Sequence, residues 1–264
     1  MKYRIDHDYH IHSFLSSCSR DPAQNPARIL QYAEENGYRD ICLTDHGWDA
    51  SVPGADEGYA RQSLEHIRSA LPLPQSAHVR FHFGCETDMN KQFVIGMSAQ
   101  GIASLDFLIV PTTHLHLTGF TIDAEGDAIE RRAALYVRRL EVLLETNFPR
   151  NKVGIAHLTC GHIAPGGRSL RVIDTVPDEV FRGLFEKTAQ KGYGVELNMP
   201  AVYDTDADLA SALRPYRIAK KCGCRFYMGS DAHHPDKFIG MPERFRALAE
   251  LLDLRESDKF RPFG

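Results

Sequence analysis

The chain has 264 residues, of which 43% are hydrophobic and 25% charged, as is ordinary for a globular protein. Its formal net charge of −4 carries no electrostatic signature of binding to nucleic acid or an anionic membrane. The amino terminus lacks an apolar signal core, and no apolar run is long enough to span a bilayer. The six cysteines show no spacing typical of secreted modules, so we expect reduced thiols in a cytoplasmic protein.

Seven apolar runs of the β type alternate with amphipathic stretches along the chain. Strands alternating with helices predict a parallel sheet with crossover helices. We therefore predict an α/β fold, a distorted (βα)7 TIM-like barrel with its active site at the carboxyl ends of the strands, formed by residues 1–264 as a single domain. An open doubly wound sheet is the alternative. The strands are expected at 3–11, 40–46, 79–86, 106–114, 153–157, 193–198 and 225–231.

Helix start and stop signals stand between these runs. Asn25 and Pro26 are typical of a helix start, and Gly37 is typical of the residue that follows a helix. Pro215 interrupts the helix expected over 208–221, so we predict a kink or a break there. Two further helices are expected, at 129–144 and from Pro177 to the residue before Gly192.

Many of the 13 histidines and several acidic residues fall where the expected strands end. In "DYHIH", His10 and His12 would share one face of a strand, as half of a metal site or as two polar residues on an edge strand. In a parallel barrel all strand carboxyl ends open on one face. Six histidines lie at such ends, which favours a metal site. The residues at these ends are His10, His12, Asp45, His46, Glu86, His114, His157, Glu196, Asn198, Asp231 and His233.

In this order and spacing, the motifs "DYHIH", "LTDHG", "GCE", "TTH", "IAH" and "GSDAH" resemble the PHP (polymerase and histidinol phosphatase) superfamily. The resemblance runs from about residue 6 to 240 and so covers nearly the whole chain. It implies a distorted seven-stranded βα barrel with a centre of two or three metal ions at the carboxyl ends of the strands. It also implies a phosphoesterase, because most stand-alone members of this kind are phosphoesterases.

The resemblance further implies which residues hold the metals. Glu86 would bridge from the first metal to a second, which His114 and His157 would complete. The ligands of the first metal would be His10, His12, Glu86 and Asp231.

His46 and His233 would belong to a third metal. The family often has another histidine at the position of Cys18, which is either a thiolate ligand suited to zinc or a small buried apolar residue. We expect Asp231, Glu86 and His233 to take part directly in catalysis.

The residue types agree with hydrolytic metal chemistry. Imidazole and carboxylate ligands suit zinc, manganese or iron ions, whereas a shell made only of oxygen would suit magnesium or calcium. A bridging carboxylate offsets the repulsion between two cations roughly 3.5–4 Å apart, and a water between them loses a proton near neutral pH. This metal-bridging hydroxide would attack phosphorus, so the expected cofactors are two or three divalent metal ions.

The expected substrate is a small phosphorylated metabolite, with histidinol phosphate as a candidate and phosphate as a product. The planar guanidinium of arginine matches phosphate oxygens, and the glycine-containing loop after the fifth strand supplies Arg168 and Arg171. The alternative is that these two residues lie in a solvated basic surface loop with no role in binding. Arg20 and Asn198 are further candidates for substrate binding.

Several readings stay open at this stage. Three other functions are alternatives to a phosphomonoesterase. They are a nuclease or nucleotide phosphodiesterase, a metal-binding regulatory module without catalysis, and an amide or lactone hydrolase. His116 is the rival of His114, and Asp8 is a candidate to orient a ligand. The polar segment 47–58 is a candidate lid, in which Trp48 lines the substrate mouth or packs the loop.

Overall fold

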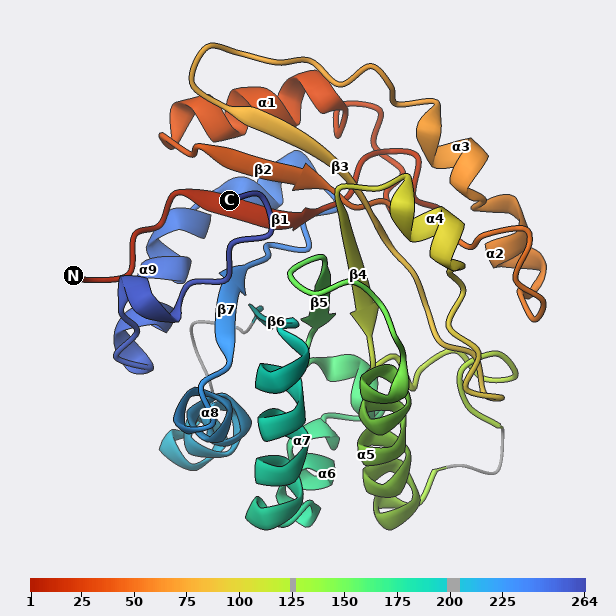
Figure 1. The fold of residues 1–264 in the computed structure, drawn as a ribbon. Coiled ribbons are helices and arrows are strands. Elements are labelled where there is room, and N and C mark those ends of the chain that lie inside the picture. The colour runs from red at the N-terminus through yellow and green to blue at the C-terminus, as the bar shows by residue number, and fades with distance from the viewer. Residues whose placement is uncertain (124–126, 199–204) are drawn as a thin grey trace.

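The computed structural model describes residues 1–123, 127–198 and 205–264. Parallel strands in these residues form a nearly closed barrel surrounded by helices, which confirms the predicted fold class (Figure 1). The strands follow one another around the sheet in chain order, a topology that excludes the doubly wound alternative. The seven strands found in the described residues are β1 (His7–Ile11), β2 (Asp40–Leu43), β3 (Arg80–Glu86), β4 (Phe107–Pro111), β5 (Val153–Ala156), β6 (Gly194–Leu197) and β7 (Arg225–Met228).

The helices begin and end close to the predicted signals. The Asn25 side chain accepts a hydrogen bond from the backbone N–H of Arg28 and caps the first helix. Gly192 ends another helix in the left-handed conformation, with φ of 69°. The helices are α1 (Pro26–Glu35), α2 (Glu57–Arg61), α3 (Leu64–Arg68), α4 (Ala99–Ala103), α5 (Ile129–Glu145), α6 (Ser169–Thr175), α7 (Asp178–Lys191), α8 (Asp206–Lys221) and α9 (Met241–Leu251).

Of the two expected outcomes at Pro215, the break is wrong, because α8 continues through this residue, and the kink stays a prediction. Pro215 is itself buried, and the neighbouring Leu213 and Tyr216 are buried with it. The side chain of Thr205 also caps the start of the helix by accepting from the backbone N–H of Asp208. Packing of the apolar face thus outweighs the loss of one backbone hydrogen bond at proline.

The strands stop earlier than their apolar runs predict. β2 ends at Leu43, β4 at Pro111 and β7 at Met228, so the residues up to 46, 114 and 231 lie beyond the strands. The histidines and acidic residues of these three runs therefore lie mostly in the segments that follow the strands. The difference arises because a run of β-type residues does not record where hydrogen bonding to the neighbouring strand ends.

The barrel closes between β7 and β1 by bonds outside the regular ladder. The backbone N–H of Met228 donates to His7 Nε2 at 3.0 Å, in place of a bond between the two strands. Beyond the strands, the N–H of Asp231 donates to the carbonyl of His10 at 2.8 Å, and that of His12 to the carbonyl of Ala232 at 3.1 Å. These bonds bring the start and the end of the chain together at the carboxyl ends of the strands.

Apolar residues fill the inside of the barrel as well as the space between the strands and the helices. Tyr9, Phe107 and Tyr227 form one buried cluster with Phe260 from the carboxyl-terminal segment. A Cβ atom at Gly194 would lie 2.6 Å from the Phe260 ring, so this close approach requires glycine. The barrel is thus a packed core, and a site for a ligand is expected at its rim.

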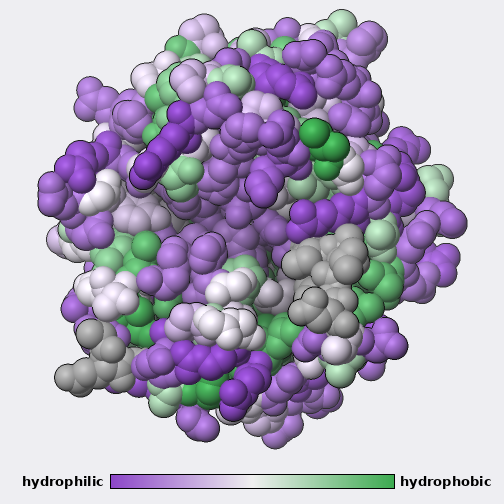
Figure 2. All heavy atoms as spheres, turned by 180° about the vertical axis from the view of Figure 1, so that it is seen from behind, coloured by the Kyte–Doolittle hydropathy of each residue, from purple (hydrophilic) through white to green (hydrophobic). Residues whose placement is uncertain are grey.

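The surface is mainly polar. Figure 2 shows one face that is hollowed near its centre, with hydrophobic residues scattered among hydrophilic ones. In the part of the chain that the structure describes, every helix is too short or too polar to cross a membrane.

Candidate metal centre

Four side-chain atoms from distant parts of the chain form a small buried cage. His12 Nε2 lies 3.0 Å from His10 Nε2, 3.2 Å from Glu86 Oε2 and 3.1 Å from Asp231 Oδ1. His10 Nε2 lies 3.3 Å from Glu86 Oε2 and 3.5 Å from Asp231 Oδ1. Four ligands at about 2.0–2.1 Å from a tetrahedral zinc ion would be roughly 3.3 Å apart. The cage therefore has the dimensions of a zinc-type site.

The second carboxylate oxygen of Glu86 faces a different set of residues. Glu86 Oε1 lies 3.8 Å from His157 Nε2, and His114 joins these two residues in a group whose ligand atoms all lie within 4.8 Å of one another. The rings of His114 and His157 are stacked with their centroids 5.1 Å apart. Glu86 thus has one oxygen in each of two adjacent groups, as a carboxylate that bridges two ions requires.

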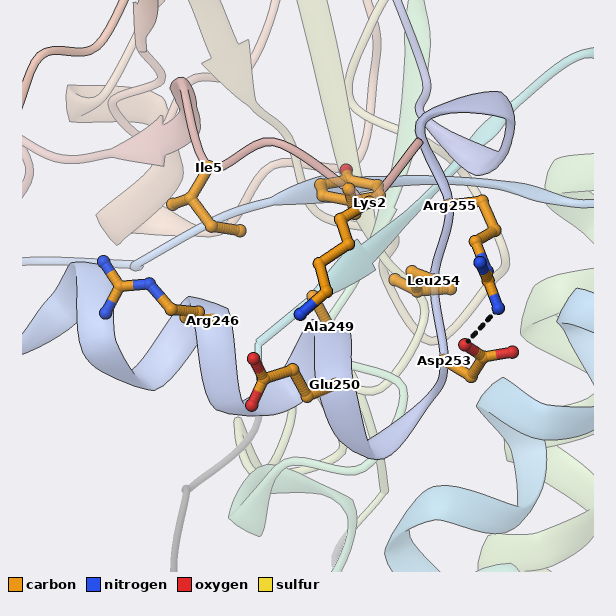
Figure 3. A pocket seen from close by; sticks show the side chains of 9 residues that line it. Lys2, Ile5, Arg246, Ala249, Glu250, Asp253, Leu254 and Arg255 are labelled. Atoms are coloured by element: carbon orange, nitrogen blue, oxygen red, sulfur yellow. Dashed lines mark ion pairs between the residues drawn. The ribbon is translucent and has the colours of Figure 1, made fainter.

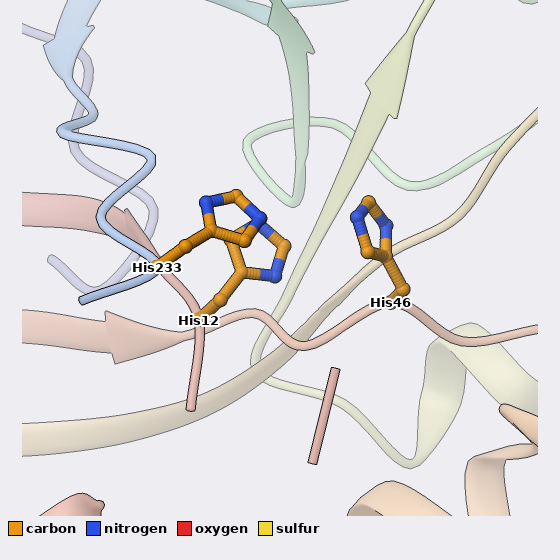
Figure 4. Close-up of side chains that lie close together, drawn as sticks. All are labelled: His12, His46 and His233. Atoms are coloured by element: carbon orange, nitrogen blue, oxygen red, sulfur yellow. The ribbon is translucent and has the colours of Figure 1, made fainter. Parts of the chain in front are cut away.

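His12, His46 and His233 form a further group, with ligand atoms within 4.8 Å of one another (Figure 4). Burial lowers the pKa of His46 to about 3, and burial together with nearby His12 lowers the pKa of His233 to about 4. Both imidazoles are neutral at pH 7, the form that binds metals. His12 has only its Nε2 available, because its Nδ1 lies 3.0 Å from Ser16 Oγ. Its Nε2 is therefore shared between this group and the cage.

Cys18 lies outside these groups of described residues. Its side chain is exposed, in a turn between the buried residues Ser16 and Ser19, so the expectation of a small buried residue is wrong. Desolvation of the thiol and the nearby carboxylates of Glu86 and Asp231 raise its pKa to about 12. Thiolate ligation by Cys18 stays a prediction.

Several buried polar atoms among the described residues have no hydrogen-bond partner here. They include both carboxylate oxygens of Glu86, both ring nitrogens of His157 and Nδ1 of His46. Buried polar atoms normally have partners, and unpaired ones cost about 1–3 kcal/mol each. Bound cations would satisfy the carboxylate oxygens of Glu86 and one ring nitrogen of each imidazole, so these ligand atoms fit divalent metal ions of the zinc, manganese or iron type.

Two residues of these groups have a left-handed backbone. His157 has φ of 52° and Asp231 has φ of 53°, a conformation that is uncommon for residues other than glycine. Strain of this kind gathers at functional sites because the surrounding structure holds a side chain in a required direction. His157 directly follows β5, and Asp231 lies three residues after the end of β7.

Carboxylates surround the two imidazoles of the cage. Burial alone would lower the pKa of His10, but the carboxylates of Glu196, Glu86 and Asp231 hold that pKa well above its usual value. Burial would also lower the pKa of His12, and the adjacent carboxylates of Asp231 and Glu86 raise that pKa to about 9. The carboxylates around the cage thus favour positive charge at its centre.

Buried groups behind the cage orient its imidazoles. Glu196 Oε1 lies 2.5 Å from His10 Nδ1, and since a carboxylate only accepts, His10 directs Nε2 toward the cage. A Cβ at Gly229 would overlap Glu196 Oε1, so this close approach requires glycine. Asp45 orients His12 indirectly. It accepts a hydrogen bond from the hydroxyl of Ser16, and the Ser16 oxygen accepts from His12 Nδ1.

Asp8, the candidate orienting residue of the sequence, accepts from backbone N–H groups and from the hydroxyl of Tyr32, and from no imidazole nitrogen of the described residues. Its Oδ1 accepts from the N–H groups of His10 at 3.3 Å and of Ser230 at 3.0 Å. Burial raises the pKa of Asp8 to about 7. Asp8 therefore joins the two segments that carry ligands of the cage.

The residues expected to bind substrate do not form a cluster like that of the candidate metal ligands. Arg168 is tied to Asp127, with its Nη2 lying 2.8 Å from both carboxylate oxygens. Arg171 and Arg20 are exposed, on α6 and after β1 respectively. Asn198 is half-buried at the end of β6, and its Nδ2 has no partner among the described residues. Their roles in binding stay predictions.

The segment 47–58 is buried at its start, at Gly47 and Trp48, and is mostly exposed beyond them. Trp48 is buried with Tyr59 and Phe120, and its Nε1 donates to the carbonyl of Val52 at 2.8 Å. Trp48 therefore packs the loop, the second of the two expected alternatives. His116, the rival of His114, has its ring centroid 5.0 Å from that of His114 but belongs to none of the candidate groups of described residues.

A surface hollow of about 490 Å³ lies away from these residues (Figure 3). Lys2 and Ile5, which precede β1, border it on one side, and Arg246 and Glu250 of α9 border it on the other. This is the side of the barrel opposite the carboxyl ends of the strands. Charges of both signs line it, and none of the candidate metal ligands does.

The chain was compared with known proteins and structures. No family model matches it, and no curated protein matches it. Among solved structures it is similar to histidinol phosphate phosphatase from Lactococcus lactis in complex with zinc, L-histidinol and phosphate. The identity is 17%, the TM-score is 0.61, and the match covers 97% of this chain and 98% of the other. This likeness shows a shared fold.

Two further matches are weaker. A probable 2-pyrone-4,6-dicarboxylic acid hydrolase from Acinetobacter baumannii is 13% identical with a TM-score of 0.47, covering 96% of this chain and 97% of the other. An N-isopropylammelide isopropylaminohydrolase from Burkholderia multivorans is 12% identical with a TM-score of 0.42, covering 95% and 68%. At these TM-scores the two likenesses carry no argument about this chain.

Proposed function

We propose that this protein is a metal-dependent phosphoesterase of the PHP type that hydrolyses a small phosphomonoester. The observation that carries the proposal is the pair of adjacent ligand groups that share Glu86. One group has tetrahedral spacing around His10 and His12, and the other adds His114 and His157. Two adjacent cation sites with a shared carboxylate are the arrangement that many phosphatases and nucleases use.

In this proposal the side chains hold the cations and leave one side open to substrate. Glu86 and Asp231 supply the negative charge, and the neutral imidazoles complete the coordination. Bound ions would supply an activated water as nucleophile and contacts that polarise the phosphate oxygens. Glu86 and His10 are buried, whereas Asp231 and His233 are 27% and 26% exposed, on the side where substrate and water enter.

We propose Asp231, Glu86 and His233 as the residues nearest the reacting atoms. Arg168, Arg171, Arg20 and Asn198 stay proposed contacts to substrate. Histidinol phosphate is the first substrate to test, because the structural neighbour from Lactococcus lactis was crystallised with L-histidinol and phosphate.

The proposal is tested by metal analysis followed by a substrate panel. Protein purified without added metal is analysed for zinc, manganese and iron, and is then assayed with histidinol phosphate, sugar phosphates and an oligonucleotide. We expect bound metal and release of phosphate from at least one monoester. Failure of every monoester with each metal supplied would refute the proposal.

The panel also separates the competing functions. Hydrolysis of the oligonucleotide alone would favour a nuclease, and hydrolysis of amide or lactone substrates alone would favour attack on carbon. Bound metal without any hydrolysis would favour a regulatory metal-binding module.

A further inference from the structure

A buried carboxylate lies behind His114, at the second ligand group. Asp88 is fully buried, and its Oδ2 lies 3.0 Å from His114 Nδ1. Because a carboxylate only accepts, Nδ1 carries the proton and His114 directs Nε2 toward Glu86 and His157. Metal-binding histidines usually donate their other ring N–H to such a partner.

Asp88 is held in place from two sides. The hydroxyl of Tyr59, on α2, donates to Asp88 Oδ2 at 2.5 Å. Arg139, which is buried on α5, has Nη2 3.7 Å from Asp88 Oδ1 and donates through Nε to the carbonyl of Thr112 at 2.9 Å. The carboxylate is thus fixed both to the loop after β2 and to the helix after β4.

The two oxygens of Asp88 face different nitrogen groups. Oδ2 lies 3.0 Å from His114 Nδ1, and Oδ1 lies 3.7 Å from Arg139 Nη2. Burial lowers the pKa of Arg139 to about 10, so Arg139 remains a cation at neutral pH. Contacts therefore run from Arg139 on α5, through the buried carboxylate of Asp88, to the imidazole of His114.

We propose that Asp88 is a positioning residue for the second metal, acting through His114, with Tyr59 and Arg139 fixing its position. The inference rests on the proposed metal centre. It is specific to one ion, because the imidazoles of the cage have other partners. His10 is oriented by Glu196, and His12 is oriented through Ser16.

The first experiment compares metal binding by the wild-type chain with that of Asp88→Asn. Binding is measured at defined free Zn²⁺, set with a chelator buffer, and by the electronic spectrum of the protein loaded with Co²⁺. We expect one class of site to lose affinity by about 10- to 100-fold, and the cage to keep its affinity. Equal affinities at every site in both proteins would overturn the inference.

A matched control comes from the opposite end of the barrel. Asp40 accepts from His82 Nε2 at 2.9 Å, so it is also a carboxylate paired with a histidine, but at the start of β2. Asp40→Asn should leave both classes of metal site unchanged. An equal loss in both variants would show a general effect on folding and would also overturn the inference.

A double-mutant cycle separates positioning from structural support. If Asp88 acts through His114, Asp88→Asn should have no further effect on metal affinity once His114→Ala is present. Additive losses would mean that Asp88 acts by another route. If Asp88→Asn does not fold, Tyr59→Phe removes one donor to the carboxylate and should weaken the same site several-fold; unchanged binding there would contradict the inference.

The outcomes also distinguish this inference from the proposed function. A wild-type chain that binds no divalent metal would refute the proposed function itself. A wild-type chain that binds two or more ions, with Asp88→Asn unchanged, would refute only the role of Asp88.

Discussion

Asp231 Oδ1 lies 3.1 Å from His12 Nε2, although the two residues come from opposite ends of the chain. Barrel closure between β7 and β1 makes this contact, since the N–H of Asp231 donates to the carbonyl of His10. The first prediction follows from it. Asp231→Asn should remove the metal from the cage and lower phosphatase activity at least ~100-fold, because the amide lacks the charge of the carboxylate.

Metal analysis and phosphate release on the same purified sample check this prediction. His12→Ala should behave in the same way, since it removes a second atom of the cage. Circular dichroism of both variants verifies that they fold. Wild-type turnover in either variant would count against the proposed centre.

Removal of metal should destabilise the protein. Without a cation, the carboxylate of Glu86 and the ring of His157 are buried with no hydrogen-bond partner. At 1,000 times the dissociation constant, one bound ion stabilises the folded state by about 4 kcal/mol, which corresponds to roughly 10 °C in Tm. Thermal unfolding with a chelator, and again after zinc or manganese is returned, measures this effect. A Tm that is indifferent to both treatments would contradict bound metal.

Arg168 can contact phosphate only at the expense of its pair with Asp127. Exposed pairs of this kind are weak, so freeing the guanidinium should improve substrate binding by no more than ~5-fold. We expect Asp127→Asn to lower KM for the phosphomonoester and Arg168→Ala to raise it, with kcat little changed. Identical KM values in the two variants would exclude Arg168 from substrate binding, and Arg171→Ala provides the comparison within the same segment.

A buried ion pair joins the two ends of the chain. Lys259 Nζ lies 2.7 Å from Asp6 Oδ1 and donates to the carbonyl of Arg4 at 2.8 Å. Burial alone would raise the pKa of Asp6, but His7 and Lys259 together lower it well below its usual value. Lys259 keeps Glu256 Oε1 at 3.1 Å, so Asp6→Asn removes one charged hydrogen bond and should destabilise the protein by about 2 kcal/mol at pH 7.

The pH dependence of this effect has a definite sign. Because the folded-state pKa of Asp6 is depressed, its stabilisation is complete above the unfolded value of about 4 and is lost as the pH falls below it. Urea unfolding of the wild type and of Asp6→Asn at pH 7 and pH 3 should show a smaller difference at pH 3. A difference that is constant or grows toward low pH would exclude the charged pair as its source.

The sequence was sufficient to predict the fold because both of its signals are local. Seven apolar runs alternating with amphipathic segments predict a parallel barrel, and the caps at Asn25 and Gly192 follow from residue type. The position of His10, His12, Glu86, His114, His157 and Asp231 near strand ends followed from the same alternation. A shared rim then brings these residues together, whatever the details of packing.

Tertiary structure alone decided which groups face each candidate ligand. Asp88 follows Glu86 by two positions, but nothing in that spacing shows that it would meet His114 and Tyr59. Glu196 stood at a strand end like the others, yet it lies behind His10 as an orienting group. Such contacts depend on barrel closure and on side-chain direction, which residue periodicity does not record.

Packing also decided two features that residue type predicted wrongly or could not predict. α8 passes through Pro215 because its apolar face is buried, and Trp48 is enclosed by Tyr59 and Phe120. Residue types and their spacing thus determined the barrel and the chemistry available at its rim. The directions of the side chains, the left-handed turn at Asp231 and the pairing of Arg168 were decided only when distant segments packed together, because their energies come from contacts between those segments.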